Sequence, residues 1–248
     1  MRRLTCIAAI VGLTLAGTTA VAQSEVPAAV AGAVADAGRP DVDKARDAAR
    51  KPAEIVAFAG VKPGDKVAEF LPGGGYYTRI LAKAVGPTGH VYLLIPAAFA
   101  QRPGGLDAIN ALAAQYGNVT VVATELTQFT LPEPVDLAWT TENYHDMHNG
   151  PTPSFAGINR ATFRALKPGG IYFVEDHSAA PGAGASVTST LHRIEPATAI
   201  AEVTAAGFAL DAQSNLLANP DDPKTAGVRD PSIQGETEKL ALRFRKNG

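Results

Sequence analysis

The chain is almost free of cysteine: Cys6 is the only one in 248 residues. It lies in an apolar N-terminal run that the sequence predicts to be removed, so the mature protein would contain no thiol. Disulfide bonds, a cysteine nucleophile and a cysteine-ligated zinc site are then excluded. A reactive or binding site must use other side chains, above all histidines and carboxylates.

The chain also lacks an excess of positive charge. Its 22 basic and 24 acidic residues give a net charge of −2, and no basic cluster stands out. This balance gives no electrostatic reason to bind nucleic acid or an anionic membrane. We therefore expect no nucleic acid partner and, once the N-terminus is cleaved, no membrane. The sequence does not indicate an oligomeric state.

Residues 1–22 have the pattern of a secretory signal peptide. Arg2 and Arg3 precede an apolar run over residues 4–16, and small residues at 20–22 precede Gln23, as at a signal-peptidase site. The apolar run is too short to cross a membrane stably. A buried N-terminal helix is the alternative. We expect export to the periplasm or the medium, with cleavage near Ala22.

Two further segments follow. Residues 23–52 are predicted to form an N-terminal helical or linker segment, in which the charges of residues 41–50 suggest a solvated helix face. Residues 53–248 are predicted to form one α/β domain. In it, apolar runs typical of strands alternate with helical segments: strands at 66–71, 89–95, 118–124, 135–141 and 171–175, and helices at 78–85, 106–116, 158–166 and 197–206.

This alternation predicts a doubly wound, mostly parallel Rossmann-like sheet. The last two apolar runs, at residues 208–212 and 240–244, are joined by a long polar loop. We expect them to form an antiparallel strand pair at the C-terminal end of the sheet.

The most informative segment is Glu69–Tyr77, which holds three consecutive glycines between the first strand and the helix that follows it. Glycine permits φ > 0 and leaves room for a ligand, and the start of the helix directs free N–H groups into that room. Such a turn is typical of nucleotide-like cofactor sites. The predicted cofactor-binding residues are Glu69, Pro72, Gly73, Gly74, Gly75, Tyr76 and Tyr77.

A second group of polar residues follows the fourth and fifth strands, at residues 140–149 and 175–178. Ligands of open α/β sheets bind at the carboxyl ends of the strands, so both segments should reach the same opening as the glycines. The predicted catalytic residues are Tyr144, His145, Asp146, His148, Asp176 and His177.

Three interpretations of this group remain open. His145 or His177 could position a substrate or act as a general base, oriented by a neighbouring aspartate. His145 and His148, in an H-x-x-H spacing, could instead bind a divalent metal together with Asp176 or His177. We do not expect a metal. The third interpretation is a hydrogen-bonded network that only fixes two loops.

The loop at residues 179–190 is rich in glycine, serine and alanine, and could cover a site. Arg193, just after it, is a candidate for binding a carboxylate or phosphate of a substrate. The alternative is an ordinary surface arginine.

Over residues 50–246 the chain resembles class I S-adenosylmethionine-dependent methyltransferases. Their acid-x-G-x-G-x-G motif is matched by Glu69, Gly73 and Gly75, with Leu71 in place of the first glycine. It looks similar to a group of exported predicted methyltransferases with P-G-G-G-Y, N-Y-H-D-x-H and D-H-S segments, here at 72–76, 143–148 and 176–178. The resemblance implies S-adenosylmethionine as cofactor and methyl transfer to an unidentified small molecule.

Ile95 departs from this pattern, because the family places an aspartate or glutamate there to accept hydrogen bonds from the ribose hydroxyls. Isoleucine cannot accept them, and an unpaired hydroxyl in a closed site costs roughly 1–3 kcal/mol. Export would also separate the protein from a cofactor that is made in the cytoplasm. The alternative function is a fold that has lost the cofactor and serves as a small-molecule-binding protein or a histidine- or metal-assisted hydrolase.

Overall fold

The computed structural model describes residues 25–149 and 154–247, so the predicted signal peptide lies outside the described residues. Seven strands form one sheet in the order β3-β2-β1-β4-β5-β7-β6. The strands are β1 (Lys66–Phe70), β2 (His90–Pro96), β3 (Val119–Thr124), β4 (Val135–Thr141), β5 (Leu166–His177), β6 (Phe208–Ser214) and β7 (Lys239–Lys246).

The first five strands pair in parallel, and β7 is antiparallel to both β5 and β6. This confirms the predicted mostly parallel sheet with an antiparallel C-terminal pair. The order of the strands reverses between β1 and β4, which places a ligand site at the carboxyl ends of these two neighbours.

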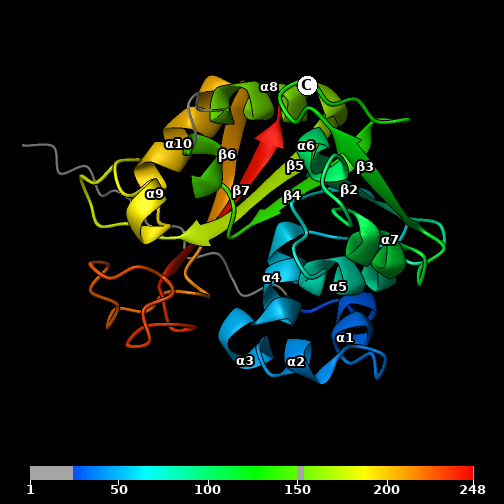
Figure 1. Cartoon of the computed structure of the whole chain (residues 1–248), viewed down its shortest axis with the longest axis horizontal. Coiled ribbons are helices and arrows are strands. Elements are labelled where there is room, and N and C mark those ends of the chain that lie inside the picture. Colours follow the sequence, from blue (N-terminus) through cyan, green and yellow to red (C-terminus); the bar gives the residue numbers. More distant parts are fainter. Residues whose placement is uncertain (1–24, 150–153, 248) are drawn as a thin grey trace, which may run out of the picture.

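Helices cover both faces of the sheet (Figure 1). On one face, α4 (Pro52–Ala59), α5 (Tyr76–Val85) and α7 (Asp107–Ala113) bury one apolar cluster. On the other face, α8 (Phe155–Ala165) and α10 (Pro196–Ala205) bury a second cluster. Successive strand residues belong to opposite clusters, as Leu93 and Leu94 do, because side chains alternate across a strand.

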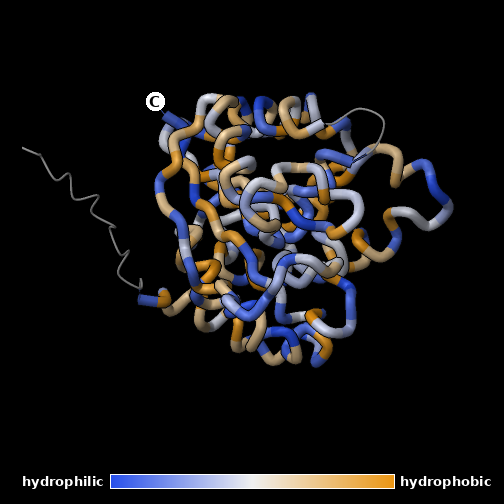
Figure 2. Tube along the Cα trace, turned by 90° about the vertical axis from the view of Figure 1, so that its left-hand side faces the viewer, coloured by the Kyte–Doolittle hydropathy of each residue, from blue (hydrophilic) through white to orange (hydrophobic). Residues whose placement is uncertain are grey.

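Orange and blue residues alternate along the helices in Figure 2, as expected where one side of a helix is buried and the other is solvated. In residues 25–149 and 154–247, none of the helices has the length and hydropathy needed to span a membrane.

The predicted strands and long helices agree with the structure to within a few residues at most of their ends. Three short helices have no counterpart among the predictions: α6 (Ala97–Ala100), η1 (His145–His148) and α9 (Thr188–Leu191). Each has four residues, which is too few for a helical hydrophobic period to show in the sequence.

The N-terminal segment packs against the domain. It forms α1 (Ala28–Val34), α2 (Asp41–Lys44) and α3 (Asp47–Arg50), and α1 buries Val30 and Ala33 in the same cluster as α5. The solvated face expected for residues 41–50 is wrong in part, because Asp43 is buried and its carboxylate lies 2.9 Å from the guanidinium of Arg79. Asp43 and Arg79 are distant in sequence, and their opposite charges form an ion pair there.

Candidate active site

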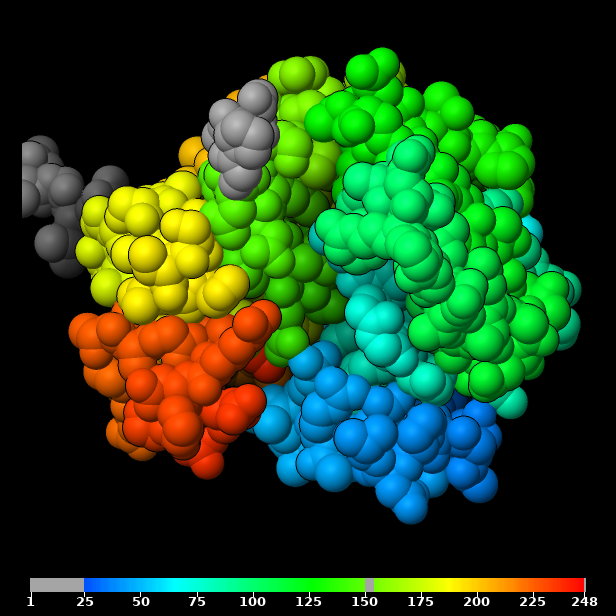
Figure 3. Space-filling view, in the orientation of Figure 1, coloured from blue at the N-terminus to red at the C-terminus, as the bar shows by residue number. Residues whose placement is uncertain are grey.

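Two adjacent cavities open at the carboxyl ends of the strands. The first, which we call the glycine cavity, has a volume of about 720 Å³ and is lined by the glycine turn. The second, the histidine cavity, has a volume of about 480 Å³ and contains His145, His177 and His192. Both volumes suit a small molecule. Figure 3 shows the depression between the blue N-terminal helices and the green segments, with the cyan segment that includes the turn at its base.

The glycine turn needs its glycines for different reasons. Gly73 and Gly75 have φ of 55° and 80°, and a side chain at Gly75 would also clash with Leu112. A Cβ at Gly74 would meet no atom within 4 Å, so this residue leaves the cavity open. Leu71 has φ of 48°, so it keeps a left-handed conformation that favours glycine, at a cost of about 1 kcal/mol.

Six of the seven predicted cofactor-binding residues line the glycine cavity, and Gly75 lies beneath it as the N-cap of α5. The hydroxyl of Tyr76 donates to Asp47 at 2.6 Å, and the guanidiniums of Arg46 and Arg50 each lie 4.8 Å from its ring centroid. The N-terminal helices thus form one wall of this cavity.

Glu69 is a buried carboxyl at the edge of the glycine cavity. Its side chain accepts a hydrogen bond from the hydroxyl of Thr78 at 2.6 Å, and it is 2% exposed. Burial raises the pKa of Glu69 to about 8, against the smaller opposing effects of Thr78 and Arg79. The carboxyl is therefore mostly protonated at neutral pH until a cation lies beside it.

Ile95 lines the glycine cavity at the end of β2, where an acidic residue was expected from the resemblance. Pro96, Phe99 and Ile109 continue this wall. The wall is apolar, so it suits a flat aromatic ring and offers no carboxylate to a ribose.

Glu142 lies where the two cavities meet. Its carboxylate pairs with Arg50 and with the ammonium of Lys239, the latter at 2.8 Å. Burial alone would raise the pKa of Glu142, but the charges of Lys239 and Arg50 lower it to about 2. Glu175 is buried behind this group, and burial raises its pKa to about 7. A φ of 54° at Glu142 shows that its backbone is held in an unfavourable conformation at this border.

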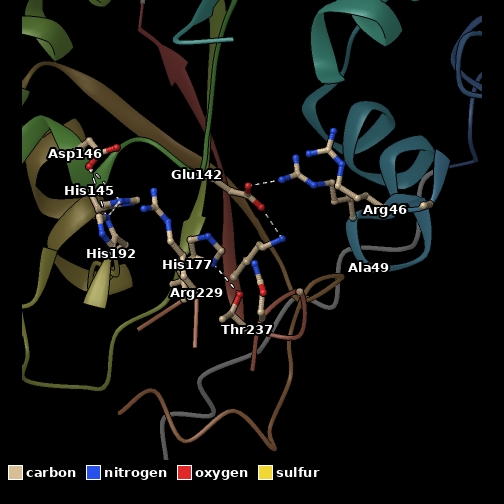
Figure 4. Close-up of a pocket in the computed structure, with 15 residues that line it drawn as sticks. Arg46, Ala49, Glu142, His145, Asp146, His177, His192, Arg229 and Thr237 are labelled. Atoms are coloured by element: carbon tan, nitrogen blue, oxygen red, sulfur yellow. Dashed lines mark hydrogen bonds and ion pairs between the residues drawn. The ribbon is translucent and has the colours of Figure 1, made fainter. Parts of the chain in front are cut away.

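His145 lines the histidine cavity (Figure 4), and its ring forms a buried pair with Asp176 behind it. Asp176 accepts hydrogen bonds from the Nδ1 of His145 at 2.8 Å and from its backbone N–H at 2.7 Å. A carboxylate only accepts, so Nδ1 carries the proton and Nε2 faces the cavity. Burial lowers the pKa of His145, but the hydrogen bond and charge of Asp176 outweigh this, and the pKa is raised.

His177 and Asp146 also lie in the histidine cavity. The Nδ1 of His177 lies 2.8 Å from the hydroxyl of Thr237, and burial lowers its pKa to about 4, so this ring is neutral. Asp146 is half exposed and lines both cavities. The structure therefore brings together four of the six predicted catalytic residues.

The other two predicted catalytic residues, Tyr144 and His148, line neither cavity and have a partner outside this group. The hydroxyl of Tyr144 donates to Glu202 at 3.1 Å, and the Nε2 of His148 lies 3.1 Å from the same carboxylate. The ring of His148 also stacks on Phe155, with 4.4 Å between centroids. His145 and His148 thus have different partners and do not converge as a pair.

No protein-family model matches the chain. Among curated proteins, a protein-L-isoaspartate O-methyltransferase of Ignicoccus hospitalis is 42% identical over 72 residues, which are 28% of this chain and 32% of that protein. The chain thus matches about a third of that relative's length.

Solved structures match far more of the chain. An S-adenosylmethionine-dependent methyltransferase from Aquifex aeolicus has a TM-score of 0.58 and 16% identity, over 83% of this chain and 96% of that one. The N-methyltransferase NodS of Bradyrhizobium japonicum has a TM-score of 0.55 and 14% identity, over 85% and 99%. The chain has the class I methyltransferase fold.

The methyltransferase fold does not by itself fix the reaction. The [4+2]-cyclase SpnF matches with a TM-score of 0.58 and 15% identity, over 86% of this chain and 85% of that one. Assignment of a reaction to this chain must therefore rest on its own cavities.

Several residues of these cavities were not predicted from sequence. The clearest is His192, whose Nδ1 lies 3.2 Å from the Nε2 of His145. The sequence directed attention to its neighbour Arg193, but that residue is neither a surface side chain nor a substrate ligand. Arg193 is fully buried and pairs with both carboxylate oxygens of Asp222, at 2.7 and 3.1 Å. Its partner Asp222 lies in the long polar loop, whose sequence contains no motif that would indicate this contact.

Proposed function

We propose that this protein is an S-adenosylmethionine-dependent methyltransferase that acts on a small molecule. The glycine cavity would hold the cofactor and the histidine cavity the methyl acceptor. The observation that carries this proposal is that the two cavities adjoin at the carboxyl ends of the strands and share Arg46, Arg50, Glu142 and Asp146. A methyl group at that border is within reach of a molecule in the second cavity.

The glycine cavity offers groups that suit the ends of the cofactor. Its apolar wall at Ile95 and Phe99 suits the adenine ring. The carboxyl of Glu69 suits a cationic group, because a cation beside a buried acid favours its ionised form. Asn143 cannot replace the missing ribose acceptor, since its amide already bonds to Phe70 and Thr140. We therefore expect binding that is weaker by about tenfold to a hundredfold than with an acid at position 95.

The histidine cavity offers groups that suit the acceptor. Methyl transfer is mainly a matter of aligning the acceptor atom with the sulfonium methyl. Because Asp176 fixes the Nδ1 proton of His145, Nε2 of the neutral ring presents a lone pair toward the cavity. The cationic side chains of Arg46, Arg50, Arg229 and Lys239 outnumber the carboxylates of Glu142 and Asp146 in its lining. This balance favours an acceptor that carries a negative charge.

The test is calorimetric titration of the mature chain with S-adenosylmethionine. In the Gly74→Val variant the new side chain enters open space in the glycine cavity without straining the backbone, so it should abolish binding and leave the fold intact. Gly117→Val is the matched control, because this exposed glycine also has room for a side chain and lies outside both cavities. Undetectable binding to the unmodified chain at millimolar cofactor, or equal binding to Gly74→Val, would contradict the proposal.

We further propose that residues 1–22 are removed on export and that the protein works in the periplasm or medium. The support is the pattern of the N-terminal sequence. The described residues start at 25, so cleavage near Ala22 leaves all of them in the mature chain. Mass spectrometry of the protein from its source cells should find Gln23 at the N-terminus, whereas an intact Met1 would contradict export.

A further inference from the structure

Three potential metal ligands meet at one side of the histidine cavity: His145, Asp146 and His192 (Figure 4). The Nε2 of His145 lies 3.2 Å from the Nδ1 of His192 and 3.4 Å from the Oδ1 of Asp146. The Nδ1 of His192 lies 4.0 Å from the same carboxylate oxygen. The three atoms thus form a closed triangle, and the residues come from η1 and from the C-cap of α9.

We propose that these three side chains bind a divalent zinc ion, with its fourth position open to the histidine cavity. The point in their plane that is equidistant from the three atoms lies about 2.1 Å from each, and an ion about 0.7 Å above this plane would lie about 2.2 Å from each, close to the usual bond lengths from zinc to histidine nitrogen and carboxylate oxygen. The edges of a tetrahedron with such bonds are about 3.4 Å, close to the mean side of this triangle. Three protein ligands and one open position are typical of reactive zinc sites.

The facing ring nitrogens of the two histidines can share one proton or bind one metal ion. Nδ1 of His145 donates a hydrogen bond to Asp176, so Nε2 is the ring atom that faces Nδ1 of His192. Two nitrogen lone pairs at this separation repel each other, so either Nδ1 of His192 carries a proton and donates it to Nε2 as a hydrogen bond, or a metal ion takes both lone pairs. An oxygen of Asp146, which is only an acceptor when ionised, lies within 4.0 Å of both nitrogens and is a third potential ligand.

Asp176 is placed as the outer partner of a metal-ligating histidine. Its carboxylate fixes the orientation of the His145 ring through Nδ1 and also accepts the backbone N–H groups of His145 and His177. Histidines that bind metals usually donate their other N–H to a carboxylate in this way. The same contact that makes Nε2 a hydrogen-bond acceptor therefore prepares it as a ligand.

His192 adopts an unfavourable backbone conformation that its surroundings stabilise. Its φ of 55° is left-handed, and such a residue persists only where its surroundings fix it. Arg193 supplies that fixation, because its buried guanidinium bonds to Asp222 and to the backbone carbonyl of Ser178 at 3.0 Å. In this conformation the ring of His192 lies against that of His145.

A catalytic role of the ion rests on the proposed methyl transfer. The proposed zinc site itself rests only on the positions of His145, Asp146 and His192. An ion there would hold an oxygen of the acceptor and lower the pKa of its hydroxyl, so that the proton is lost to solvent before the oxygen takes the methyl group. The cationic lining described above would then attract the same anionic acceptor.

The experiment is equilibrium dialysis of the chelator-treated mature chain against zinc chloride, without cofactor. We expect one zinc ion per chain and, on replacement with Co²⁺, the visible absorption of a tetrahedral site. His192→Ala and Asp146→Asn should each weaken binding at least tenfold; both side chains are partly exposed, so the fold should persist. Asp176→Asn should weaken it about tenfold to a hundredfold. His90→Ala is the matched control, because this histidine bonds to Thr120 at the opposite end of β2.

No zinc binding at stoichiometric protein, or equal loss in the His90→Ala control, would overturn the zinc site. Binding that survives both His192→Ala and Asp146→Asn would overturn it as well. Because no cofactor is present in the dialysis, a failure here leaves the titration with S-adenosylmethionine unaffected, and a failure of that titration leaves the zinc measurement unaffected.

Discussion

Glu69→Gln offers a sharp test of the buried acid beside the glycine cavity. The carboxyl of Glu69 has one hydrogen bond, from Thr78 at 2.6 Å, and burial raises its pKa to about 8. A glutamine has nearly the same shape, and its amide oxygen can accept the same hydrogen bond. The substitution therefore removes the ability to ionise and changes little else.

The sign of the effect follows from the direction of the pKa shift. The folded protein holds the proton of Glu69 up to pH about 8, whereas the unfolded chain releases it near pH 4.5. Between these values the folded state binds more protons, so the free energy of unfolding falls as pH rises. The full loss is roughly 3–5 kcal/mol, from about 1.4 kcal/mol for each unit of pKa shift. The Glu69→Gln variant cannot ionise at this position, so its free energy of unfolding does not fall for this reason as the pH rises.

The assay is urea unfolding of both proteins at pH 5 and pH 9. At pH 5 the two free energies of unfolding should agree to within about 1 kcal/mol. At pH 9 the variant should be more stable by roughly 3–5 kcal/mol. Other groups with raised pKa values, such as Glu175, are present in both proteins and cancel in the difference. A difference that is the same at both pH values would refute a buried, protonated Glu69.

Three further predictions follow from the same two cavities. Ile95→Asp introduces a hydrogen-bond acceptor for the ribose and should tighten S-adenosylmethionine binding, measured by calorimetry, about tenfold to a hundredfold. An unchanged or weaker affinity would show that the ribose does not lie beside residue 95. Binding of the cofactor at pH 7 should release up to about one proton, because a cation beside Glu69 lowers its pKa from about 8. Calorimetry in buffers of different ionisation enthalpy measures the number of protons released. Binding without proton release would contradict contact between a cationic group of the cofactor and Glu69. Glu142→Gln should lower the free energy of unfolding by roughly 1–3 kcal/mol, because it leaves the buried ammonium of Lys239 without its nearest carboxylate. The control is Asp41→Asn on the exposed side of α2, which should change the free energy of unfolding by less than about 0.5 kcal/mol. Equal effects of the two substitutions would contradict the role of the buried pair.

The fold could be predicted from local patterns because each strand and long helix carries its own signal. β4, for example, was predicted with the same bounds, Val135–Thr141, from one apolar run between polar segments. The glycine turn likewise marked the position of the first cavity, since its conformation depends on the turn residues themselves. The N-terminal helices were harder, because their charged residues have partners such as Arg79 far along the chain.

The histidine cavity could be predicted only in part, for a related reason. His145, Asp146, Asp176 and His177 follow two strands whose carboxyl ends must meet, so topology alone brings them together. His192 follows no strand, and its position depends on the buried pair of Arg193 with Asp222. No spacing in the sequence reveals such a long-range contact. Tyr144 and His148 were grouped with the cavity by sequence proximity, but their side chains reach Glu202 instead.

The most direct test of the central claim is a crystal structure of the mature protein with S-adenosylhomocysteine. We expect the ligand in the glycine cavity, with its adenine against Ile95 and Phe99 and its sulfur near Glu142 and Asp146, where the two cavities meet. Ligand bound elsewhere, or oriented with its sulfur away from the histidine cavity, would contradict it.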